Sequence, residues 1–117
     1  YTWQRGLPDL REALARYHTR LYGRTFSAEE FFITGSGMQA IQITLAMTAT
    51  AGSEVVIPTP AWPNAAGATG LVGAHPVELP MTFGNAGWAL DMERMSAAVT
   101  DRTRVIVMVT PSNPTGW

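Results

Sequence analysis

Apolar residues recur every three or four positions near the start of the chain, which is the spacing of an amphipathic helix. The apolar positions are Leu10, Ala13, Leu14, Tyr17 and Leu21. Asp9 is expected to cap this helix and Gly23 to end it. Arg11, Arg16 and Arg20 fall between the apolar positions, so we expect them to form a solvated face.

After this helix, short apolar runs alternate with helix-compatible stretches. The expected strands are 31–34, 55–57, 75–79 and 104–109, the last being the clearest. The expected helices are a short turn opened by a capping box at Ser27, then 38–49, 63–71 and a helix to about Val99 that Asp91 caps; residues 81–88 are expected to be an exposed loop. Strands separated by helices require crossover connections, so the sequence predicts an α/β fold with a mainly parallel sheet.

The composition excludes several classes of protein. The 117 residues are 46% apolar, carry a net charge of −1 and include no cysteine. These values argue against intrinsic disorder, a nucleic-acid surface, a disulfide scaffold and a thiolate metal site. His18 and His75 are too far apart in the pattern to suggest a metal pair, so no metal is expected.

All eight basic residues are arginines, and there is no lysine. A mechanism that needs a lysine amine therefore cannot be completed by these residues alone. The chain opens on Tyr1, and no apolar run reaches the ~18 residues of a membrane helix. We expect an internal piece of a larger soluble protein.

The unusual residues come directly after the expected strands, where ligands of open α/β sheets bind. The segment 35–40, Gly-Ser-Gly-Met-Gln-Ala, joins a strand to a helix, and its backbone amides suit an anion such as phosphate. Trp62 lies between Pro60 and Pro63 and offers a rigid surface for a flat ring. Asn113 offers an amide at the same edge. Each feature alone also fits an ordinary turn or a packing residue, but together they specify a ligand with a phosphate and a polar aromatic ring.

The chain resembles the class I/II aminotransferases, which are pyridoxal-phosphate enzymes of fold type I. The motifs that carry the resemblance are Tyr1, Gly6, Leu10-Arg11-Glu12, Gly23, Thr34-Gly35-Ser36-Gly37-Met38-Gln39-Ala40, Pro58-Thr59-Pro60-Ala61-Trp62 and Ser112-Asn113-Pro114-Thr115-Gly116. The resemblance implies that residues 1–117 are part of the large, cofactor-binding domain, with 1–25 as a helical segment packing on it. It also implies reversible amino transfer between an amino acid and a 2-oxo acid.

The resemblance further implies which residues hold pyridoxal 5′-phosphate. Backbone amides of Ser36, Gly37 and Met38 are expected to grip its phosphate. Trp62 is expected to stack on the pyridine ring, and Asn113 to donate a hydrogen bond to its phenolic oxygen.

Other implications concern the whole protein. Tyr1 is expected to reach the phosphate of the partner subunit in a cytoplasmic homodimer, and Thr34 and Gln39 to support the glycine turn. The family's Schiff-base lysine, its ring-nitrogen aspartate and its substrate-binding arginine are expected beyond Trp117. No catalytic residue is therefore assigned here, and the chain alone is expected to be inactive.

Two alternatives remain open. The segment 35–40 also fits the G-x-G-x-x-A pattern of a dinucleotide-binding unit. Such a unit needs an acidic residue at the end of the second strand, whereas Glu54 lies before that strand. The other alternative is a non-catalytic α/β segment used for packing or association. Binding of pyridoxal phosphate, of NAD or of neither separates the three interpretations.

Overall fold

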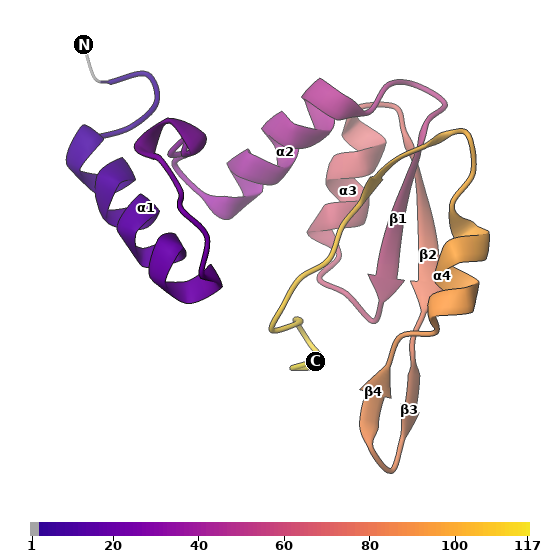
Figure 1. The fold of residues 1–117 in the computed structure, drawn as a ribbon. Coiled ribbons are helices and arrows are strands. Elements are labelled where there is room, and N and C mark those ends of the chain that lie inside the picture. Colours follow the sequence, from indigo (N-terminus) through magenta and orange to yellow (C-terminus); the bar gives the residue numbers. More distant parts are fainter. Residues whose placement is uncertain (1–2) are drawn as a thin grey trace. The chain divides into compact units, whose positions relative to one another are not determined.

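The computed structural model describes residues 3–117, which divide into two compact units at the Gln39–Ala40 junction. The first unit contains helix α1 (Pro8–Tyr22) and a short 3-10 helix, η1 (Ala28–Glu30). Helix α2 (Gly37–Thr48) begins in the last residues of the first unit and continues into the second (Figure 1). The predicted helix from residue 38 is thereby confirmed.

Helix α1 ends as predicted and begins differently. Gly23 takes the left-handed conformation with φ 68°, and its N–H donates to the carbonyl of Thr19 at 3.0 Å. The helix starts at Pro8 behind Leu7, and no side chain caps it. The prediction that Asp9 is the cap is therefore wrong, because proline at the first helical position moves the start two residues earlier.

Residues 31–34 do not form the predicted strand. Ile33 donates one hydrogen bond, 3.1 Å long, to the carbonyl of Arg5, and Phe32 remains 58% exposed. A β-favouring run becomes a strand only beside another strand, and the described part of the first unit contains none. The close neighbour of this run is Gly6, where a Cβ atom would lie 2.4 Å from the Cβ of Ile33.

The charged residues of the first unit are partly paired. Arg5 and Arg11 both bind the carboxylate of Glu29, and the Arg11 side chain is only 11% exposed. The hydrogen bond and charge of Arg11 lower the pKa of Glu29, and the charge of Arg5 lowers it further. The predicted solvated face is therefore wrong for Arg11, while the side chain of Arg16 is 70% exposed as predicted.

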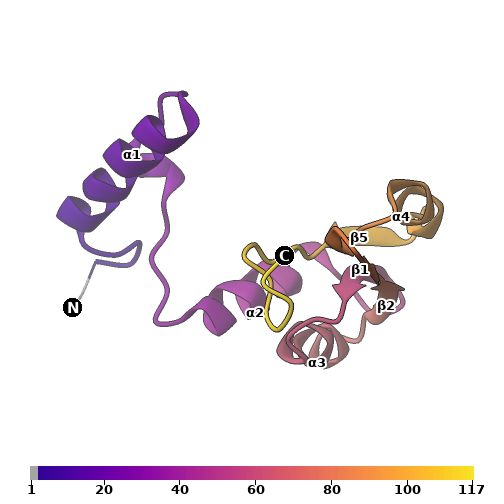
Figure 2. The ribbon, with the colours of Figure 1, turned by 90° about the horizontal axis from the view of Figure 1, so that it is seen from below.

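The second unit is built on a parallel sheet of three strands in the order β2-β1-β5. Their bounds are β1 Glu54–Thr59, β2 His75–Pro80 and β5 Thr103–Ile106. Helix α3 (Asn64–Leu71) connects β1 to β2, and helix α4 (Met92–Ala98) precedes β5. Figure 2 shows α3 and α4 on opposite faces of the sheet. The predicted α/β fold with a parallel sheet and helical crossovers is confirmed.

The core follows the alternation of β1. Val56 packs with Leu79 of β2 and Met95 of α4 on one face of the sheet. Its neighbours Val55 and Ile57, also buried, belong to the other face. Asp91 caps α4 as predicted, since its Oδ1 accepts hydrogen bonds of 3.0 Å from the backbone N–H groups of Glu93 and Arg94.

Two predictions about the second unit need correction. In place of the loop expected at 81–88, residues 82–89 form a hairpin, β3 (Thr82–Gly84) paired antiparallel with β4 (Gly87–Ala89). Strand β5 ends at Ile106, three residues before the predicted end, although Val107 still donates to the carbonyl of Val56 at 2.9 Å. Each of the helices within residues 3–117 falls short of the length and apolar character needed to cross a bilayer.

Candidate functional site

The glycine turn lies at the start of α2. The hydroxyl of Thr34 donates to the carbonyl of Ser36 at 2.8 Å, and the N–H of Gly35 donates to Oε1 of Gln39 at 2.7 Å. In return, the N–H of Gln39 donates to Oγ of Ser36 at 3.1 Å. Thr34 and Gln39 thus support the turn, as predicted.

This turn leaves donors at the helix start. The first amides of an α-helix have no partner inside the helix, and here these include Gly37 and Met38. The space next to Gly37 is open, because an added Cβ would meet no atom within 4 Å. The turn therefore has the backbone donors and the dipole that an anion requires.

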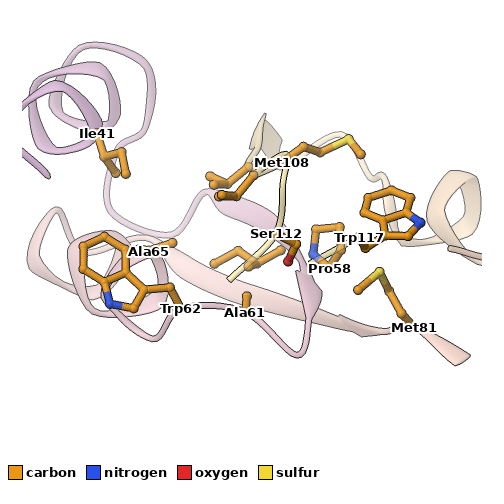
Figure 3. A pocket seen from close by; sticks show the side chains of 12 residues that line it. Ile41, Pro58, Ala61, Trp62, Ala65, Met81, Met108, Ser112 and Trp117 are labelled. Atoms are coloured by element: carbon orange, nitrogen blue, oxygen red, sulfur yellow. The ribbon is translucent and has the colours of Figure 1, made fainter. Parts of the chain in front are cut away.

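A pocket lies in the second unit, where β1 ends and the segment after β5 passes over it (Figure 3). Its volume is about 30 Å³, and its lining carries no charged side chain. The lining residues are Ile41, Ile57, Pro58, Ala61, Trp62, Ala65, Met81, Val107, Met108, Val109, Ser112 and Trp117. Ligand pockets usually measure about 300–1,000 Å³, so this hollow is too small to enclose a cofactor and forms part of a wall.

Trp62 contributes its indole to one end of this pocket. The residue lies in the segment between β1 and α3, with Pro60 before it and Pro63 after it. The Thr59–Pro60 peptide bond is cis. The indole is 38% exposed, so part of its surface is free. It can therefore present an aromatic surface at the carboxyl end of the sheet, as predicted.

The loop 112–117 lies at the same pocket through Ser112 and Trp117. The N–H of Ser112 donates to the carbonyl of Trp117 at 2.8 Å, and the N–H of Gly116 donates to the carbonyl of Ser112 at 2.7 Å. Asn113 follows Ser112 and is exposed, and the bond to Pro114 is cis. The structure thus brings the loop that carries Asn113 to the pocket of Trp62.

The remaining predicted site residues have different outcomes. Ser36, Gly37 and Met38 belong to the first unit, so their meeting with Trp62 and the Asn113 loop at one ligand stays a prediction. Tyr1 lies outside the described residues.

The pocket residues that were not predicted as site residues include Met81, Met108 and Trp117. The methionines follow β2 and β5, so the rule that sites gather where strands end was a usable signal for them. Trp117 carried no such signal, because only the closure of its loop onto Ser112 brings it to the pocket.

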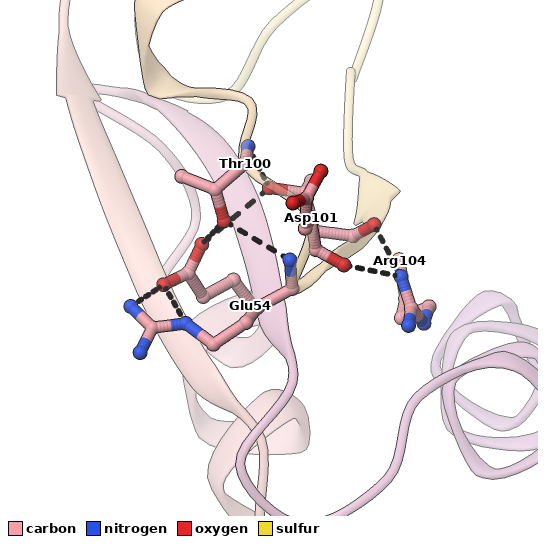
Figure 4. Close-up of polar contacts among 6 residues, drawn as sticks. Glu54, Thr100, Asp101 and Arg104 are labelled. Carbon is pink, nitrogen blue, oxygen red and sulfur yellow. Dashed lines mark hydrogen bonds and ion pairs between the residues drawn. The ribbon is translucent and has the colours of Figure 1, made fainter.

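A buried carboxylate lies at the opposite end of β1. Glu54 is buried, and its carboxylate accepts a 2.6 Å hydrogen bond from the hydroxyl of Thr100 (Figure 4). The same carboxylate forms an ion pair with Arg102. The hydrogen bond from Thr100, followed by that from Arg102, lowers the pKa of Glu54. These contacts connect the start of β1 to the turn before β5, so their role is structural. No group of three metal-ligating side chains occurs among residues 3–117.

Comparison with known proteins identifies this arrangement. The family described as aminotransferase class I and II matches residues 1–117. The chain belongs to this family. Its fold is that of the fold type I aminotransferases, and the dinucleotide-binding alternative has no support.

Curated relatives of this aminotransferase chain share about a third of its residues. An aspartate aminotransferase of Streptomyces avermitilis is 35% identical over 116 residues, which are 99% of this chain and 28% of the relative. An aspartate/prephenate aminotransferase of Thermus thermophilus is 35% identical over 95% of this chain and 29% of its own length. The chain thus spans less than a third of these two relatives.

A solved structure shows the same fold. The N-succinyldiaminopimelate aminotransferase of Mycobacterium tuberculosis superimposes with a TM-score of 0.94 at 31% identity, over 100% of this chain and 31% of that one. These proteins are named for different substrates, but each name describes an aminotransferase.

Proposed function

We propose that the full-length protein carrying this chain transfers an amino group between an amino acid and a 2-oxo acid, with pyridoxal 5′-phosphate as its cofactor. The observation that carries the proposal is the match of the aminotransferase family over residues 1–117. Within that protein, the chain supplies noncovalent contacts to the cofactor. When bound, this cofactor acts as an electron sink for the reacting amino acid.

The glycine turn holds the phosphate in this proposal. The N–H groups of Ser36, Gly37 and Met38 donate to phosphate oxygens. Support comes from the start of α2 at Gly37, where the first backbone amides have no partner inside the helix. A negative charge at a helix N-terminus gains roughly 0.3–2 kcal/mol from the dipole, in addition to the hydrogen bonds.

Trp62 and Asn113 hold the aromatic ring. The exposed part of the Trp62 indole gives the ring a flat surface to stack on, and the exposed amide of Asn113 donates to the phenolic oxygen. The residues fit such a ring, because the pocket wall is apolar and the loop bearing Asn113 lies at the same wall. Because the hollow measures only about 30 Å³, the ring lies against this wall in the proposal and not inside the hollow.

The remaining parts of the proposal concern the whole protein. The chain contains no lysine, so the amine that bonds the cofactor comes from elsewhere in the protein, and these residues alone do not transaminate. We further propose a cytoplasmic homodimer in which Tyr1 donates to the phosphate held by the partner subunit. Residues 1–117 form part of the large domain, on which 1–25 packs.

A titration tests the proposal. The full-length protein, stripped of bound cofactor, is titrated with pyridoxal phosphate and separately with NAD, while the absorbance spectrum is followed. A shifted pyridoxal band with no response to NAD supports the proposal. Binding of NAD alone supports a dinucleotide-binding protein, and binding of neither supports a non-catalytic segment.

A further inference from the structure

The loop that carries Asn113 is closed by two hydrogen bonds at Ser112, and one of them comes from a residue outside the motif. The N–H of Gly116 donates to the carbonyl of Ser112 at 2.7 Å. The carbonyl of Trp117 accepts the N–H of Ser112 at 2.8 Å, and the N–H of Trp117 donates to Oγ1 of Thr115 at 3.3 Å. Within residues 3–117 the amide of Asn113 makes no hydrogen bond of its own. The direction of that amide therefore depends on the backbone between Ser112 and Trp117.

The side chain of Trp117 lies at the pocket, partly exposed. Its indole is 37% exposed and lies at the opposite end of the pocket from Trp62, near Pro58 and Met81 (Figure 3). The indole is thus seated against residues that end β1 and follow β2. Because the same residue offers the carbonyl that closes the loop, a shift of the indole moves the hydrogen bond to Ser112.

We propose that Trp117 is a positioning residue for the cofactor site, whose seated indole holds the loop that aims the amide of Asn113. The inference rests on the proposed function. Trp117 does not touch the cofactor in this proposal; its effect passes through Asn113. Any substitution at position 117 keeps the backbone carbonyl, so the proposal concerns the anchoring by the side chain.

Cofactor affinity tests the proposal in the full-length protein. Trp117→Ala should weaken pyridoxal phosphate binding about tenfold, and Trp117→Phe, which still fills the pocket with a ring, should restore most of that loss. Trp88→Ala is the matched control, because this indole pairs with Phe83 in the hairpin and lies outside the pocket. The control should bind the cofactor as the unmodified protein does.

A double-mutant cycle with Asn113→Ala gives the decisive result. If Trp117 acts through Asn113, Trp117→Ala should add little to the loss already caused by Asn113→Ala. Additive losses, or unchanged affinity in Trp117→Ala, would overturn the proposal. If Trp117→Ala does not fold, Trp117→Leu takes its place in the cycle, since it fills part of the pocket.

The outcomes also separate this proposal from the proposed function. Should Asn113→Ala and Trp62→Ala both bind the cofactor normally, the assigned cofactor site is wrong. Should both bind weakly while Trp117→Ala binds normally, only the role of Trp117 is wrong.

Discussion

Gly6 lies against Ile33 so closely that an ideal Cβ on the glycine would be 2.4 Å from the Cβ of Ile33. Gly6 also has a φ of 93°, which side-chain-bearing residues rarely adopt. Its position is fixed on both sides, because Gly6 donates to the carbonyl of Trp3 and Ile33 donates to the carbonyl of Arg5. The chain entering α1 and the segment after η1 can approach this closely only with glycine at position 6.

Gly6→Ala should therefore destabilise the protein strongly. The positive φ alone costs about 1–3 kcal/mol, and the clash with Ile33 adds to it. Urea unfolding of the full-length protein measures the loss. The matched control is Gly67→Ala in α3, where an added Cβ meets nothing within 4 Å and should stabilise the helix by about 0.5–1 kcal/mol. An unchanged midpoint for Gly6→Ala would contradict the packing described.

The contacts of Glu54 predict a dependence of stability on pH. Its pKa is lowered from 4.5 in the folded protein, first by the hydroxyl of Thr100 and then by Arg102. Just below pH 4.5 the unfolded chain therefore binds more protons at this group. The stabilisation is present above the ordinary pKa and is lost as the pH falls through the lowered one.

Thr100→Val should shift that loss to higher pH, because it removes the largest cause of the lowered pKa and keeps the shape of the side chain. Melting temperatures measured between about pH 3 and 7 follow the shift. Thr82→Val is the control, since the Thr82 hydroxyl makes only a 3.5 Å contact with the carbonyl of Ala89 in the hairpin. Coincident pH curves for Thr100→Val and the unmodified protein would show that Thr100 does not lower the pKa of Glu54.

Elements with local signals were predictable from the sequence. The cap at Asp91 and the left-handed end at Gly23 act within a few residues, and the structure contains both. The strand predicted at 31–34 depended on a neighbour that no local signal supplies. The ion pair of Arg11 with Glu29 likewise joins residues 18 positions apart.

The hairpin at 82–89 was not predicted, for a different reason. Its glycine-rich tip was interpreted as loop composition, whereas the strands around it are held by a pair of rings, Phe83 and Trp88, with centroids 5.0 Å apart. Two parts of the candidate site, Trp62 and the loop of Asn113, were predictable because they come directly after strands. Trp117 was not, because its place depends on how that loop closes.

The stacking surface gives a prediction of its own. Trp62→Ala should weaken cofactor binding roughly 2- to 10-fold, which corresponds to the 0.5–1.5 kcal/mol of an aromatic pair. Trp62→Phe should keep most of the affinity, because it retains a ring. Equilibrium titration of the full-length protein measures both, and equal affinities for Trp62→Ala and the unmodified protein would contradict the assignment.

The glycine turn permits a substitution that removes one amide and little else. Gly37 is the first residue of α2, where its N–H has no partner in the helix and where proline is well tolerated. Gly37→Pro should therefore keep the melting temperature of the cofactor-free protein while losing a hydrogen bond to the phosphate. Bonds to charged groups contribute about 1.5–3 kcal/mol, so affinity for pyridoxal phosphate should fall roughly ten- to hundredfold.

Gly37→Ala is the matched control, because it adds a methyl group in open space and keeps the N–H. It should bind the cofactor nearly as tightly as the unmodified protein, with an unchanged melting temperature. Equal affinity loss in both variants would mean that the space beside Gly37 matters and the amide does not. No loss in either would place the phosphate elsewhere, since a turn that holds it through backbone donors cannot lose one of them without effect.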